Sequence, residues 1–162
     1  MTTQDQATPL QMRLIGFGAI AAGLFGILVG VELLPVPGGR DNLHGPLWIA
    51  LLIGLVVLLA GLAALLQSFG RAGSTGELAP DAPLWMRAAQ YLLATAMFAG
   101  FAAIGTWVAL LGDPRYFSGG VPFLGGLNIS LARIGFGFGA LICWAATIGY
   151  AVVGVRRLLR RK

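Results

Sequence analysis

Charged residues are scarce in this 162-residue chain. They make up 10% of it, whereas a soluble domain carries roughly a quarter. No charged side chain occurs in four stretches, at residues 14–31, 45–70, 88–112 and 134–155. A helix needs about 20 apolar residues to cross a hydrocarbon core of roughly 30 Å. The lack of charge therefore excludes an ordinary soluble domain and predicts four membrane-spanning helices.

The apolar stretches also lack the alternation of polar and apolar residues that marks the strands of a membrane β-barrel. A continuous helix pairs its own backbone N–H and C=O groups, which lipid cannot do. We expect an all-α fold, a four-helix transmembrane bundle, in one domain covering residues 1–162. The predicted spans are about 14–34, 47–69, 88–111 and 134–155, and the connections between them are too short for a further domain.

Cysteine and histidine are almost absent. The single cysteine, Cys143, excludes an internal disulfide framework and a Cys-x-x-Cys redox pair. The single histidine, His44, excludes a zinc site built from several histidines and a haem held between two of them. No nucleophile–base pair or carboxylate dyad is evident either. The sequence predicts no metal, no cofactor and no enzymatic activity.

The basic residues are unevenly distributed. With four spans, the N-terminus, the second connection and the C-terminus share one side, which carries eight of the 11 basic residues. Lys and Arg gather on the cytoplasmic side of membrane proteins, so we expect both termini in the cytoplasm. The tail "VRRLLRRK" is interpreted as a topology signal that also contacts anionic lipid, rather than as a nucleic-acid patch.

Two stretches repeat Pro-Leu-Trp at the start of an apolar run, "HGPLW" and "DAPLW". Proline is favoured in the first turn of a helix, and tryptophan prefers the headgroup level of a membrane. Trp48 and Trp85 are therefore expected to anchor the second and third spans on opposite sides of the membrane. Trp107 is expected to anchor the far end of the third span.

Small residues recur at helical spacing in every span. Helices in lipid associate by close packing at such residues, since burial of apolar surface cannot drive them together. In the first span they follow one another every four positions. The residues expected to pack helix against helix are Gly18, Ala22, Gly26, Gly30, Gly54, Gly61, Gly100, Gly135 and Gly139.

One acidic residue, Glu32, lies near the interior of an apolar run. Carboxylates inside membranes are candidates for ion or proton handling. We favour a position of Glu32 at the outer edge, in reach of headgroup water, and a position of His44 in a loop or helix cap. A polar cluster on the outer face is expected to contain Glu32, Arg40, Asp41, His44, Asp113, Arg115 and Arg133.

Two resemblances bear on function. The stretch "GPLWIALLIGLVVLLAGLAALLQS" resembles the small membrane subunit of tripartite tricarboxylate transporters, but only over the first half of the chain. The second half lacks the long cytoplasmic segment and late helix pattern of that subunit, so carboxylate transport does not carry over. The whole chain, through "RYFSGGVPFLGG" and "ARIGFGFGALICW", resembles small uncharacterised four-span proteins of proteobacterial inner membranes. That resemblance implies a bacterial inner-membrane location and supplies no activity.

The sequence thus favours a non-enzymatic accessory or scaffold subunit, or a homo-oligomer. Its partners would be the lipid bilayer and another membrane protein or further copies of itself, not nucleic acid. The alternative is a small transporter or channel component that uses Glu32 and the outer-face charges.

Overall fold

The computed structural model describes residues 8–39, 46–69, 78, 82–112 and 126–159. They form four α-helices, each long and apolar enough to cross a membrane. The predicted all-α fold with four such helices is therefore confirmed. The helices are α1 (Pro9–Gly30), α2 (Leu47–Phe69), α3 (Leu84–Leu111) and α4 (Gly126–Leu159).

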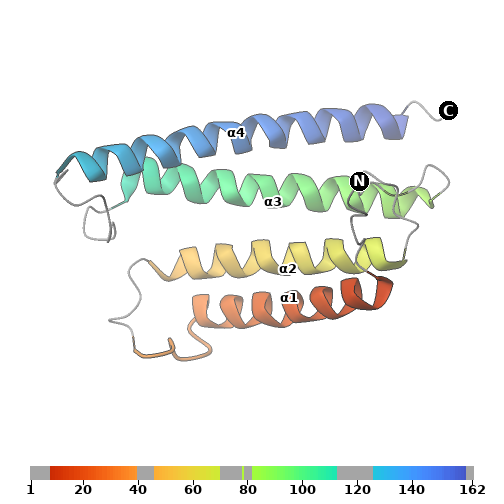
Figure 1. The fold of residues 1–162 in the computed structure, drawn as a ribbon, viewed down its shortest axis with the longest axis horizontal. Coiled ribbons are helices and arrows are strands. Elements are labelled where there is room, and N and C mark those ends of the chain that lie inside the picture. The colour runs from red at the N-terminus through yellow and green to blue at the C-terminus, as the bar shows by residue number, and fades with distance from the viewer. Residues whose placement is uncertain (1–7, 40–45, 70–77, 79–81, 113–125, 160–162) are drawn as a thin grey trace, which may run out of the picture.

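The four helices lie side by side in chain order and form a single layer (Figure 1). α1 packs extensively on α2, and α3 on α4, whereas the contact between α2 and α3 is smaller. The two helices of each hairpin run antiparallel, and α1 and α4 occupy opposite edges of the layer (Figure 1). A closed bundle would bring α1 beside α4, so the predicted bundle is open in this structure.

The first helix has a well-defined start and end. Thr8 and Gln11 form a capping box, in which the Thr8 side chain accepts from the Gln11 N–H and the Gln11 side chain accepts from the Thr8 N–H. The helix ends at Gly30, and Glu32, two residues on, has a φ of 61°. A left-handed residue cannot continue a right-handed helix. The backbone at Glu32 is why α1 ends before the predicted limit of the span at Leu34.

The last two helices extend beyond the predicted spans. α4 has 34 residues, and at 1.5 Å per residue it is about 51 Å long. A hydrocarbon core is roughly 30 Å thick, so both ends of α4 reach past it or the helix is tilted. α3 starts at Leu84, directly after Pro83, because proline is accommodated at a helix start and not in a helix interior.

Large apolar side chains are exposed along all four helices, and few of the described side chains are buried. The buried hydrophobic residues are Val29, Val56, Leu78, Met86, Ala102 and Ala140. A single layer of helices leaves both of its flat faces uncovered. Such a surface suits a surrounding of lipid tails, which are as apolar as leucine.

Candidate functional site

The contact between α1 and α2 is a backbone-to-backbone approach at glycine. A Cβ added at Gly23 would lie 2.5 Å from the backbone nitrogen of Leu58 and 2.7 Å from the carbonyl oxygen of Gly54. A Cβ added at Gly54 would lie 2.6 Å from the backbone nitrogen of Ile27. Neither position has room for a side chain. The hairpin therefore depends on glycine on both helices.

The same approach recurs at seven-residue intervals along α1. Towards its start, a Cβ at Gly16 would lie 3.1 Å from the carbonyl oxygen of Gly61, and towards its end a Cβ at Gly30 would lie 2.5 Å from the backbone nitrogen of Leu51. Gly16, Gly23 and Gly30 are therefore spaced seven residues apart, as the equivalent positions of a heptad repeat are. A seven-residue repeat keeps one seam on the partner helix along its length.

The structure places four of the predicted packing residues in this seam: Gly26, Gly30, Gly54 and Gly61. Two others face away from it. Ala22 is exposed, and a Cβ at Gly18 would meet nothing within 4 Å among the described residues. The sequence analysis did not predict Gly16 and Gly23 as packing residues. It used the four-residue spacing that begins at Gly18, whereas the contact follows the seven-residue spacing of Gly16, Gly23 and Gly30.

Small residues also form the contact between α3 and α4. A Cβ at Gly105 would lie 3.1 Å from the Ala140 Cβ, and one at Gly154 would lie 3.0 Å from the Tyr91 Cβ. Between α2 and α3, a Cβ at Gly100, a predicted packing residue, would lie 2.5 Å from Val56 Cγ2. By contrast, Cβ atoms at the predicted Gly135 and Gly139 would meet nothing within 4 Å in the described part of the chain.

Hydrogen bonds between side chains link α3 to α4. Trp144 Nε1 donates to Thr106 Oγ1 at 3.2 Å, and Arg157 Nη1 donates to the Tyr91 hydroxyl at 3.0 Å. The Trp144 bond joins the middle of α4 to Thr106 near the end of α3, and an unpaired indole N–H facing lipid would be costly. These bonds fix the register of the hairpin.

The three predicted tryptophan anchors lie near helix ends. Trp48 and Trp107 contact each other edge to face, with ring centroids 5.1 Å apart, which joins the start of α2 to the last turns of α3. Trp85, in the first turn of α3, is 66% exposed at the opposite end of the layer. That exposure fits a ring that meets headgroups rather than protein.

Of the predicted outer-face cluster, Glu32 and Arg133 are described. Arg133 Nη2 donates to the Gly112 carbonyl oxygen at 2.6 Å, and so binds the C-cap residue of α3. A guanidinium is favoured at a helix C-terminus, where carbonyl groups are left without partners. The remaining members, Arg40, Asp41, His44, Asp113 and Arg115, lie outside the described residues.

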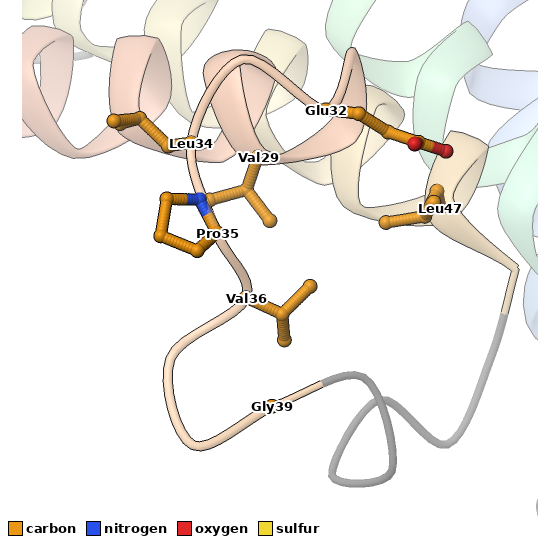
Figure 2. A pocket seen from close by; sticks show the side chains of 7 residues that line it. All are labelled: Val29, Glu32, Leu34, Pro35, Val36, Gly39 and Leu47. Atoms are coloured by element: carbon orange, nitrogen blue, oxygen red, sulfur yellow. The ribbon is translucent and has the colours of Figure 1, made fainter.

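Glu32 lines a hollow of about 380 Å³ beside the end of α1 and the start of α2. Figure 2 shows its side chain directed towards the start of α2, beside Leu47, with Val36 on the other side of the hollow. The positive φ of Glu32 costs an ordinary residue roughly 1–2 kcal/mol. The hollow is the one place in the described ranges where a carboxylate borders a cavity at the end of a predicted span.

No group of three or more His, Cys, Asp or Glu residues that could hold a metal ion occurs within the described ranges. No protein-family model, curated protein or solved structure matches the chain. Both resemblances drawn from the sequence therefore stay predictions, and function is argued from the residues of the chain itself.

Proposed function

We propose that the chain is a non-enzymatic structural subunit of a bacterial inner membrane, and that it associates with another membrane protein or with copies of itself. The observation that carries this proposal is the open layer. α4 contacts α3 on one side, and away from that contact a Cβ at Gly135 or Gly139 would meet nothing within 4 Å among the described residues. Gly135 and Gly139 lie one turn apart and about 40° apart around the helix, at 100° per residue. Such a surface allows close approach of another helix.

We also propose that both termini face the cytoplasm. Among the described residues, four arginines lie at the end of the layer where α1 begins and α4 ends: Arg13, Arg87, Arg156 and Arg157. The opposite end has Arg133 and the acidic Glu32. This excess of positive charge supports a cytoplasmic location for the end of the layer where α1 begins and α4 ends.

The test of the structural role is affinity purification of the tagged full chain in mild detergent, followed by mass spectrometry and sizing. We expect a stoichiometric membrane-protein partner or a discrete oligomer, and we expect Gly139→Leu to reduce its recovery at least several-fold. Ala145→Leu, on the same helix at an exposed position, is the matched control and should retain it. A monomer without partner, or equal recovery with both variants, would contradict the proposal.

The hollow at Glu32 supports a second candidate, a small transporter or channel component. Its test is proton flux into proteoliposomes, followed with a trapped pH-sensitive dye. If Glu32 handles protons, Glu32→Gln abolishes the flux while Glu32→Asp retains part of it, because only the carboxylate exchanges a proton. Flux at the level of empty liposomes, or flux unchanged in Glu32→Gln, would exclude this use of Glu32.

A further inference from the structure

A groove of about 410 Å³ runs between α3 and α4 in the half of the hairpin that ends at the arginines. Five of its eleven lining residues are alanine or glycine: Ala88, Ala96 and Ala99 of α3 and Ala151 and Gly154 of α4. Small side chains leave a channel between two helices that otherwise touch. The channel is apolar and faces the surroundings of the layer.

The groove has the length of one membrane leaflet. From Ala88 to Ala99 it spans 11 helical steps, or about 16 Å at 1.5 Å per residue. Half of a 30 Å hydrocarbon core is about 15 Å. A fatty-acyl chain that enters at the arginine end therefore extends along the whole groove before it reaches the membrane centre.

Two arginines, Arg87 and Arg157, neighbour residues that line the mouth of the groove. Tyr91 lines the groove, and its hydroxyl accepts from Arg157 at 3.0 Å, which holds that guanidinium beside the mouth. Arg87 lies one turn before Tyr91 on the same face of α3, and its Nη1 is buried with no hydrogen-bond partner among the described residues. A buried donor without an acceptor is costly, and a phosphate oxygen is a favourable acceptor for guanidinium.

We infer that the groove binds one anionic phospholipid. An acyl chain lies between α3 and α4 on the small residues, and the phosphate contacts Arg87 and Arg157. The arginines at the mouth favour an anionic headgroup. The apolar groove binds the acyl chain that is attached to it. The inference does not depend on the structural role proposed above.

The experiment uses the full chain in mild detergent and native mass spectrometry to measure the apparent Kd of the first lipid bound. The probes are phosphatidylglycerol and phosphatidylcholine with identical acyl chains. We expect phosphatidylglycerol to bind at least tenfold more tightly. Equal affinity for the two lipids would overturn the proposal without the use of any variant.

The headgroup site and the groove are tested with separate variants, of which the first removes the two arginines of the headgroup site. Arg87→Gln with Arg157→Gln should weaken phosphatidylglycerol binding about 25-fold, at about fivefold for each base near an anionic headgroup. Arg13→Gln with Arg156→Gln is the control, because it removes the same charge at the same end of the layer. Arg13 packs over Phe69 of α2, and Arg156 lies on the other face of α4 from Gly154. Equal losses in the two double variants would contradict a local site.

Ala99→Leu fills the groove and should weaken phosphatidylglycerol binding at least fivefold, whereas Ala145→Leu, at an exposed position of α4, should not. Circular dichroism identifies any variant that has lost helix. Unchanged binding by folded Ala99→Leu would overturn the acyl-chain site. Glycerol 3-phosphate in millimolar excess should not displace the lipid, and displacement would show a site for a soluble phosphate instead.

Discussion

A Gly23→Ile variant is expected to lose the packing of α1 on α2. The first side-chain carbon would be placed 2.5 Å from the backbone nitrogen of Leu58, and a backbone atom inside a helix cannot turn aside as a flexible side chain can. Overpacking of a close contact lowers the free energy of unfolding by about 1–3 kcal/mol. We expect a loss at the upper end of this range, because the atom in the way belongs to the backbone. The measurement is the free energy of unfolding in mixed micelles with increasing SDS, followed by circular dichroism.

Gly18→Ile is the matched control. It makes the same substitution five residues earlier in the same helix, where a Cβ meets nothing within 4 Å in the described part of the chain. Both variants change the helix propensity of α1 alike, so the difference between them reports only the contact with α2. Equal stability of the two variants would show that Gly23 is not in a helix contact.

An Ala102→Leu variant is expected to separate α3 from α4. Ala102 is 0% exposed, and it lies three residues before Gly105, on the face of α3 that approaches Ala140. A leucine there adds three carbon atoms to a filled interface, at an expected cost of about 1–3 kcal/mol. The same SDS titration measures the loss. Because Trp144, one of four tryptophans, donates to Thr106 in this hairpin, the total tryptophan fluorescence should also change.

The control for Ala102→Leu is Ala145→Leu, at an exposed position of the partner helix. Leucine in contact with lipid costs little, so this variant should unfold at the same SDS fraction as the natural chain. If Ala102→Leu is as stable as Ala145→Leu, then α3 and α4 do not pack through this face.

The existence of the four helices was predictable from the sequence, because the exclusion of charge from a hydrocarbon core leaves long runs without charge. Where the helices end was less predictable. α1 ends at Gly30 because Glu32 adopts a left-handed φ, and glutamate carries no sequence signal for that conformation. α4 extends from Gly126 through Leu159, since nothing in the polar residues beyond the apolar run stops a helix.

The choice of packing faces was only partly predictable. Every span offers small residues on more than one face, and the sequence does not say which face has a partner. On α1 the heptad through Gly16, Gly23 and Gly30 packs on α2, whereas Gly18 faces outward. The open layer itself had no sequence signal, because four short-connected spans are compatible with both a closed and an open arrangement.

Specific pairings lay beyond the sequence. The acceptor of the Trp144 N–H is Thr106, 38 residues away, and the Arg133 guanidinium binds Gly112 at the end of another helix. Each depends on the register of α3 against α4, which Gly105 and Gly154 set by close approach. The groove beside Tyr91 follows from the same register.

The distance between α1 and α4 tests the open layer most directly. Spin labels at Ala22 and Ala145 in a Cys143→Ser background lie at exposed positions and similar depths of the two edge helices. Pulsed electron paramagnetic resonance in liposomes should give about 24–30 Å, which is three interhelical spacings of 8–10 Å. A distance of about 10 Å, the value for neighbouring helices, would show a closed bundle and contradict the single layer.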